Sequence, residues 1–189
     1  VTGAILDGMG DSQSDLDVYV LTSESGFSRR ESTFADERRQ QQKRKDFGII
    51  YLPVGNAEID VECHRIRKFE DLFKALANLE SAELEQLNKT FGSLGSFDRL
   101  EALELLHRFR IAKPFANEES FHALRSKFDE QKFFIWNASH CLIQVSDAQK
   151  ETRRSLNNGD FESAYLKLTR LYDVLVDAYL FSIGQSMDR

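Results

Sequence analysis

The sequence predicts an α+β fold, in which a small mixed sheet with flanking helices is followed by an all-helical bundle. Up to about residue 66, apolar and polar residues alternate in short runs bounded by Gly, Pro and Asp, which is typical of strands. From Lys68 onward, apolar residues recur every three or four positions, which is typical of amphipathic helices. We therefore expect two domains, residues 1–66 with about four or five strands and residues 67–189 with helices only.

Composition limits the classes of function. The 189 residues are 41% hydrophobic and 30% charged, as in ordinary globular proteins. A net charge of −6 disfavours binding to long nucleic acid, because domains that bind it tend to be basic. No apolar run approaches the roughly 18 residues of a membrane helix, so we expect no membrane association. Cys63 and Cys141 lack metal-ligand spacing, which indicates free thiols and a cytoplasmic protein.

The chain begins with a stretch rich in Gly and Asp, GAILDGMGDSQSDLDVYVL at residues 3–21. We expect a short helix at residues 4–9 and a strand at residues 15–22. Because strand side chains alternate between faces, Asp15 and Asp17 share one face of that strand. Neighbouring carboxylates repel unless a cation lies between them, and Mg²⁺ prefers oxygen ligands. The alternative is an Asp-rich turn that leads into a surface strand.

The next elements complete the predicted sheet. Residues 22–30 are polar and predict a loop. Residues 31–46 contain mostly helix formers, and their basic half is either a solvated helix face or an element that contacts triphosphate or RNA. Residues 47–54, FGIIYLPV, predict a buried strand. The turn residues at 55–56 predict a hairpin with the strand that follows.

A second acidic pattern lies on that following strand, at Glu58-Ile59-Asp60-Val61-Glu62. The alternation of acidic and apolar residues predicts one hydrated face. Asp60 is the first candidate for a metal ligand there, and Glu62, on the same face, is the alternative. His64 is the histidine nearest to this pattern, and it is a candidate general base.

The remaining elements are predicted to be helices. We expect them at residues 82–91, 97–110 and 129–156, with GSLGS at 92–96 as a break. Asn117 is expected to cap a further helix that contains Phe121, Leu124 and Phe128. Residues 157–160 predict a helix stop, and Asp160 is the expected N-cap of a last helix that ends near residue 183. Five leucines are expected on or near its buried side: Leu166, Leu168, Leu171, Leu175 and Leu180.

Two of these patterns together resemble a known superfamily. Gly3-Ala4, a spacer of about ten residues, and Ser14-Asp15-Leu16-Asp17 before Val-Tyr-Val resemble the signature of the polymerase-β-like nucleotidyltransferases. That family carries its third carboxylate on a later strand, where Asp60 stands in this sequence. The resemblance covers about the first third of the chain. It is closest to the minimal and aminoglycoside-type members, which carry a helical C-terminal domain.

The resemblance implies a site and an activity. Asp15, Asp17 and Asp60 would be catalytic and would bind two Mg²⁺ ions together with the nucleotide. The backbone at Gly3 and Ala4, and the Ser14 hydroxyl, would contact the triphosphate. The implied reaction transfers a nucleoside monophosphate from a nucleoside triphosphate, with ATP as the expected donor, to a hydroxyl of a small molecule or protein side chain. Family members have a helix before the first strand, so we expect this sequence to be trimmed at its start.

One residue departs from the signature and leaves other functions open. The family usually has serine at the position of Ala4, and alanine loses a hydrogen bond to the triphosphate, worth about 0.5–1.5 kcal/mol when neutral and more to a charged group. An antitoxin-like interaction protein is one alternative function. A nucleotide sensor with weak or no turnover is the other.

Overall fold

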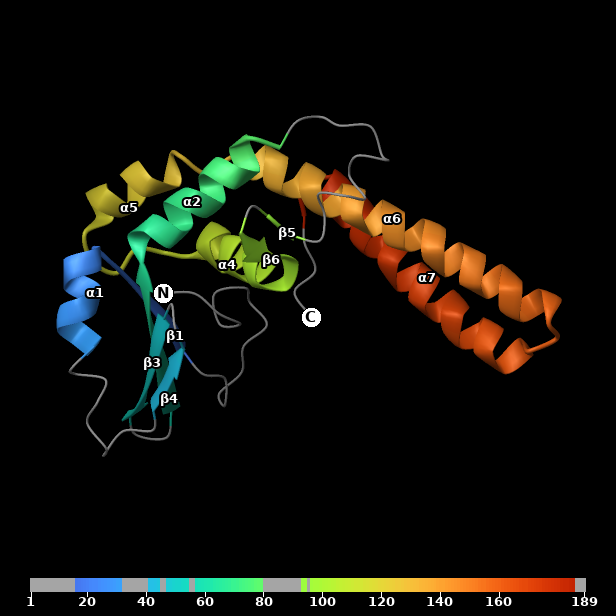
Figure 1. Ribbon diagram of the computed structural model, residues 1–189, viewed down its shortest axis with the longest axis horizontal. Helices are drawn as coiled ribbons and strands as arrows, with labels where there is room; N and C mark the ends of the chain where they lie inside the picture. Colours follow the sequence, from blue (N-terminus) through green and yellow to red (C-terminus); the bar gives the residue numbers. More distant parts are fainter. Residues whose placement is uncertain are drawn as a thin grey trace. The chain divides into compact units, whose positions relative to one another are not determined.

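The computed structural model describes residues 16–31, 41–44, 47–54, 57–79, 93–94 and 96–185. It shows a mixed α+β chain with more helix than strand (Figure 1). The chain divides into two compact units. The first, here called the sheet unit, contains Val1–Ala75 and Leu100–Phe128. The second, called the hairpin unit, contains Leu76–Arg99 and Asp129–Arg189. A domain boundary between residues 66 and 67 stays a prediction.

The sheet has four strands in the order β1-β4-β3-β2. They are β1 (Leu16–Thr22), β2 (Gln41–Arg44), β3 (Phe47–Val54) and β4 (Ala57–Arg65). β1 pairs with β4 in parallel, whereas β2 with β3 and β3 with β4 are antiparallel. The predicted mixed sheet and the predicted β3–β4 hairpin are therefore confirmed.

The loop predicted at residues 22–30 is wrong, because α1 (Glu24–Glu31) begins there. Its first turn is closed by Ser23, whose Oγ accepts a hydrogen bond from the Gly26 N–H at 3.2 Å. The Ser23 carbonyl also accepts from the Phe27 N–H at 2.8 Å. A serine that satisfies these first N–H groups is a helix N-cap, and the burial of Phe27 holds the short helix on the sheet.

The helix predicted at residues 31–46 is also wrong over its last part, which forms strand β2. Gln41 pairs with Ile50 and Arg44 with Phe47 across the antiparallel β2–β3 ladder. Pairing with β3 thus overrides the helix propensity of these residues. A short, charged strand at the edge of a sheet also discourages pairing with other chains.

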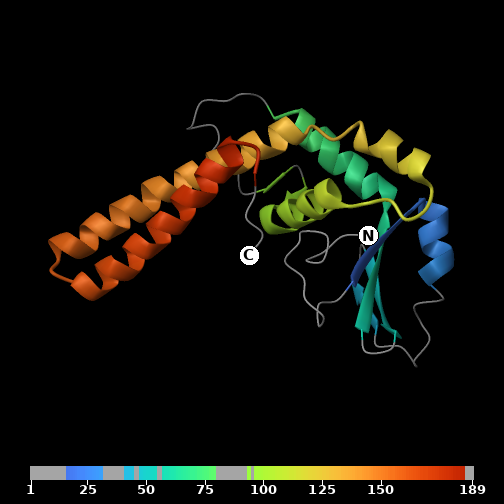
Figure 2. The same ribbon diagram turned by 180° about the vertical axis from the view of Figure 1, so that it is seen from behind.

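The two faces of the sheet contact different helices. Val20 on β1 and Cys63 on β4 pack against Phe27 of α1. One residue away on each strand, Tyr19 and Glu62 point to the opposite face and reach α4 (Arg99–Ile111). Figures 1 and 2 show α1 and α4 on opposite sides of the strands. The period-two alternation predicted from the sequence therefore separates an apolar face from a polar one.

Helices α2 (Ile66–Ala77), α4 and α5 (Glu118–Arg125) supply an aromatic core to the sheet unit. Ring centroids of neighbouring members lie 4.9–6.2 Å apart. The members are Phe69, Phe73, Phe109, Phe121 and Phe128. The helical spacing of apolar residues expected from Lys68 onward is confirmed in α2, because Phe69, Leu72, Phe73 and Leu76 are all buried. This core fixes the position of α4 within the sheet unit.

Helix α5 differs in detail from its prediction. Asn117 is at the N-cap position, but its φ is 54° and its side chain makes no capping hydrogen bond. Asparagine is among the residues that adopt this left-handed conformation most readily. Asn117 therefore suits the N-cap position through its backbone conformation and not through a side-chain hydrogen bond. Phe128 lies beyond the end of α5, yet its ring still packs against Phe73 at 5.4 Å.

The second part of the chain is not all-helical, which corrects the prediction. β5 (Ser93–Leu94) and β6 (Phe97–Asp98) form a two-stranded antiparallel pair. This pair takes the first two residues of the helix predicted at 97–110, so α4 starts at Arg99 instead. The helix predicted at residues 82–91 lies outside the described residues.

Two long helices, α6 (Glu130–Asn157) and α7 (Phe161–Ser182), form an antiparallel helical hairpin, and both were predicted. They lie side by side in Figures 1 and 2. Asp160 caps α7 as predicted, because its carboxylate accepts a hydrogen bond from the Ser163 N–H at 3.1 Å. Gly159 in the turn has φ 72°, a conformation that suits glycine. No helix in the described ranges is long and apolar enough to span a membrane.

The buried side predicted for α7 is wrong at three of its five leucines, whereas Leu171 and Leu180 are partly buried. Leu166, Leu168 and Leu175 are exposed. Instead, Cys141 of α6 forms a buried cluster with Val174 and Ala178 of α7, and Val145 and Phe181 pack against it. Both cysteines of the chain are buried free thiols, as predicted.

Candidate active site

Asp17 and Asp60 are directly opposite each other on the parallel strands β1 and β4. Neighbouring strands lie about 4.8 Å apart, and paired residues project to the same face, so the two carboxylates come from adjacent positions. That face is the polar one, because the residues two positions further on, Tyr19 and Glu62, both contact α4. Asp15, Gly3, Ala4 and Ser14 lie outside the described residues, and their roles stay predictions.

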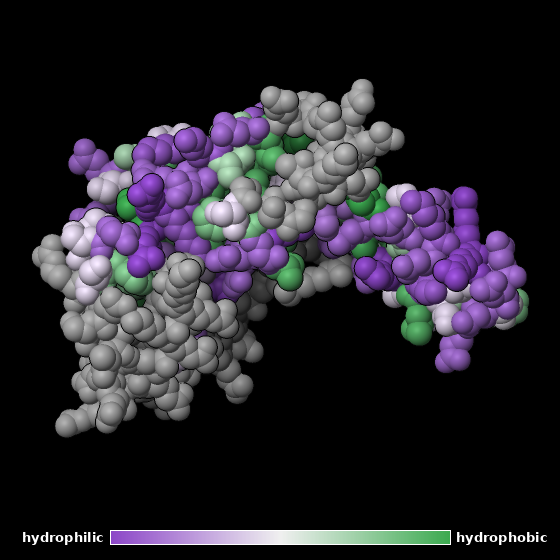
Figure 3. Space-filling model, in the orientation of Figure 1, coloured by the Kyte–Doolittle hydropathy of each residue, from purple (hydrophilic) through white to green (hydrophobic). Residues whose placement is uncertain are grey.

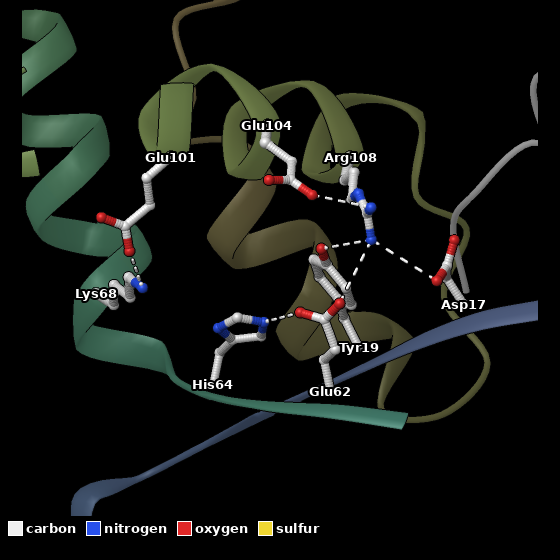
Figure 4. A network of polar contacts seen from close by, with 8 residues as sticks. All are labelled: Asp17, Tyr19, Glu62, His64, Lys68, Glu101, Glu104 and Arg108. Carbon is white, nitrogen blue, oxygen red and sulfur yellow. Dashed lines mark hydrogen bonds and ion pairs between the residues drawn. The ribbon is translucent and has the colours of Figure 1, made fainter. Parts of the chain in front are cut away.

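Arg108 of α4 is the centre of the polar contacts on this face (Figure 4). Its Nη1 lies 3.6 Å from Oδ1 of Asp17 and 3.4 Å from Oε1 of Glu62, and it donates a hydrogen bond to the Tyr19 hydroxyl at 3.0 Å. Its Nη2 contacts Oε1 of Glu104, one helical turn earlier on α4, at 2.9 Å. One guanidinium therefore balances carboxylates from β1, β4 and α4.

The charge state of this cluster follows from its surroundings. Burial alone would lower the pKa of Arg108, but Tyr19 and the nearby carboxylates, Asp17 first among them, outweigh it and the pKa is raised. Burial, followed by the negative charge of Glu62, raises the pKa of Tyr19 well above its ordinary value. The face thus presents a permanent cation and a neutral phenol beside its carboxylates.

Glu62 is held from two sides. His64 Nε2 lies 2.9 Å from Oε2 of Glu62, while Arg108 approaches Oε1. Because an ionised carboxylate only accepts, this contact places the histidine proton on Nε2. His64 is buried, with its ring 4.9 Å from that of Tyr19 and 5.8 Å from that of Phe69. The alternative ligand Glu62 therefore already has protein partners on both oxygens.

A further ion pair fastens α4 within the sheet unit. Lys68 of α2 donates to Oε1 of Glu101 on α4 at 2.6 Å, and the lysine side chain is nearly buried (Figure 4). Lys68 and Arg108 thus tie two positions of α4 to segments before it in the chain. This double attachment keeps the Arg108 guanidinium over the strand that carries Asp17.

The carboxylates on the polar face meet part of what the implied metal needs. Asp17 and Asp60 supply the hard oxygen donors that Mg²⁺ prefers, from adjacent strands. Within the part of the chain that the structure describes, no group of three or more His, Cys, Asp or Glu residues is arranged to hold a metal ion. Two of the three expected ligands fit the group, and the third, Asp15, lies outside the described residues.

Comparisons with known proteins add no family. No family model matches the chain, and neither the curated proteins nor the solved structures contain a match.

The sequence did not reveal Arg108 as part of the site. It lies within a helix predicted from its apolar residues, and its partners on β1 and β4 are distant in sequence. A signal of its role came only from the residues next to Arg108 in the sequence. Arg108 lies between Leu106 and Phe109 of the buried face and one turn after Glu104, which marks a charged residue at the edge of a packed surface.

Proposed function

We propose that this chain is a metal-dependent nucleotidyltransferase, which moves a nucleoside monophosphate from a nucleoside triphosphate, with ATP as the expected donor, to an acceptor hydroxyl. The proposal is carried by the pairing of Asp17 with Asp60 on neighbouring parallel strands. Two carboxylates from separate acidic patterns thereby come together on the polar face of a mixed sheet, as the resemblance to polymerase-β-like nucleotidyltransferases requires.

The residues have distinct tasks in this reaction. Mg²⁺, when bound with the nucleotide, lowers the pKa of an attacking hydroxyl and neutralises the pyrophosphate that leaves. Asp17 and Asp60 would hold it, and Asp60 would also help to take up the proton of the acceptor. Arg108, 3.6 Å from Asp17, provides a fixed positive charge that suits phosphate oxygens. The acceptor is a small molecule or a protein side chain.

Pyrophosphate release tests the proposal. The chain is incubated with each of four labelled nucleoside triphosphates, Mg²⁺ and a panel of acceptors. We expect turnover that falls at least about 100-fold in Asp17→Asn and in Asp60→Asn, because each variant loses a charged oxygen ligand. Asp71→Asn is the matched control, since Asp71 is an exposed aspartate of α2 in the same unit. Full turnover in Asp17→Asn would contradict the assignment.

A second candidate function is supported by the position of Arg108. Its guanidinium already compensates Asp17 and Glu62, which lowers the benefit of adding a metal cation there. A nucleotide sensor or antitoxin-like interaction protein with weak or no turnover would tolerate this. Mg²⁺ with triphosphate would then raise the melting temperature by binding the folded state, without pyrophosphate release.

A further inference from the structure

Helix α7 exposes a regular row of large side chains, here called the α7 stripe. Its members are between 45% and 72% exposed. They are separated by four, three, four, three and four residues: Phe161, Tyr165, Leu168, Tyr172, Leu175 and Tyr179. On the side of the molecule shown in Figure 3, the α6–α7 hairpin carries hydrophobic side chains scattered among hydrophilic ones. The stripe is continuous by comparison, since it runs almost the whole length of α7.

The stripe is separate from the contact that holds the hairpin together. At 100° per residue, its six members fall within an arc of about 80°. The buried residues Ala164, Val174 and Ala178, which mark the side of α7 facing inward, fall on a neighbouring arc. Leu166, also exposed, lies about 140° away from the centre of the stripe. Most of the surface of the stripe therefore lies outside the contact between α6 and α7, although Leu175, at its edge, is 45% exposed.

The spacing is that of a helix which packs along its length against another helix. Alternating steps of four and three residues keep one seam facing a partner through a left-handed supercoil. Single exposed apolar residues are normal on protein surfaces, but a contiguous row of six marks an interaction site. The stripe also alternates in type, with Tyr165, Tyr172 and Tyr179 between one phenylalanine and two leucines.

We propose that the α7 stripe binds the same stripe of a second copy of this chain, in an antiparallel pair centred near residue 170. This register places Phe161 opposite the partner's Tyr179. It also places Tyr165 opposite the partner's Leu175 and Leu168 opposite the partner's Tyr172. Each layer then combines one tyrosine with one leucine or phenylalanine, so a two-fold axis makes the stripe complementary to itself. The tyrosine hydroxyls reach water at the rim of the contact.

The area and the charges of the stripe suit such a pair. Its exposed parts sum to roughly 600–800 Å² per copy, since an aromatic side chain buries about 150–250 Å² in full. A stable interface buries about 800 Å² per partner. The positions that flank the stripe on its outer side, Glu162, Thr169 and Val176, carry a single charge, so like charges do not face one another. The lack of a basic face disfavours an anionic membrane as the occupant.

The oligomeric state of the full chain tests this inference independently of any catalytic activity. In sedimentation equilibrium at roughly 1–100 µM protein, we expect a mass twice the 21.8 kDa of one chain. Leu168→Glu should weaken the dimer at least tenfold, because it puts a carboxylate into the seam. Leu166→Glu is the matched control on the same helix and should leave the dimer unchanged. Far-UV circular dichroism should be the same for all three proteins, because both leucines are exposed.

Cross-linking tests the antiparallel register. In the double variant Leu168→Cys with Tyr172→Cys, each new thiol faces a thiol of the other copy, and oxidation should link two chains. In Leu168→Cys alone, the two thiols lie too far apart for a disulfide. A monomer throughout the concentration range, or an unchanged dimer in Leu168→Glu, overturns the proposal. A disulfide in the single variant, or none in a dimeric double variant, overturns the antiparallel register.

Discussion

The polar face of the sheet and the α6–α7 hairpin are built in opposite ways. On the sheet, Arg108 contacts residues of strands that are far away in sequence, and large aromatic rings fill the core beside it. In the hairpin, two consecutive helices meet around Cys141, Val174 and Ala178, with Val145 and Phe181 packed against them, and several large side chains of α7 are exposed. The first arrangement depends on long-range packing, whereas the second depends on local signals at the ends of two helices. The comparison predicts where a single substitution has a large effect and where it has a small one.

The largest effect is expected at Phe109, whose ring lies 4.9 Å from that of Phe73 and 5.5 Å from those of Phe69 and Phe121. Phe109→Ala should lower the free energy of unfolding by about 3–5 kcal/mol, because it removes a buried ring and leaves a cavity. Urea denaturation measures the change. Phe115→Ala is the control, since Phe115 is 88% exposed, and it should change stability by less than about 0.5 kcal/mol. Similar losses in both variants would contradict the proposed role of the aromatic core.

The same contrast explains which elements the sequence could predict. The ends of α6 and α7 were predictable, because their signals are local: Asp129 accepts from the Lys132 N–H at 2.9 Å, and Asp160 does the same at the start of α7. Helix α1 and strand β2 were not predicted, because each also depends on a distant partner, although Ser23 caps α1 locally. Phe27 needs Cys63 of β4 to be buried, and Gln41 needs the edge of β3.

The residues of the candidate site also differ in whether the sequence could predict them. The alternation around Asp17 and Asp60 predicted two hydrated strand faces, and the structure shows the two strands paired in parallel. Neither pattern could predict Arg108, because its position depends on how α4 packs in the sheet unit. The side of α7 that is buried against α6 could not be predicted either. Leucines and alanines recur at similar helical spacings there, so the spacing alone does not distinguish the side of α7 that faces α6.

A smaller effect is expected from a titratable group in the hairpin unit. Burial, together with the positive charge of Arg99, lowers the pKa of His140 on α6 from 6.5 to about 4. The folded protein therefore favours neutral His140, so the stability this gives is complete above pH 6.5 and is lost as the pH falls toward 4. Between pH 7.5 and 4.5, the unfolding free energy of the wild type should fall by about 2.5 kcal/mol more than that of His140→Gln.

Urea denaturation at the two pH values measures this difference, and carboxylates that titrate in both proteins cancel from it. His122→Gln is the control, because His122 is an exposed histidine of α5 beside Glu118. It should keep the full wild-type dependence on pH. A parallel loss of stability in wild type and His140→Gln would show that His140 is protonated freely in the folded hairpin unit.

The smallest effect on stability is expected at the turn between α6 and α7, where a substitution changes only the backbone conformation. Gly159 has φ 72°, and a Cβ added there would meet no atom within 4 Å. The turn is closed by the Gly159 N–H, which donates to the Leu156 carbonyl at 3.1 Å, and by the Asp160 N–H, which donates to the Ser155 carbonyl at 3.0 Å. Gly159→Ala should therefore lower stability only through the left-handed backbone, by about 1 kcal/mol. Gly159→Asn should lower it by less, because asparagine adopts this conformation more readily. Thermal unfolding of both variants measures the order, and an asparagine variant less stable than the alanine variant would show that the turn is fixed by more than its local conformation.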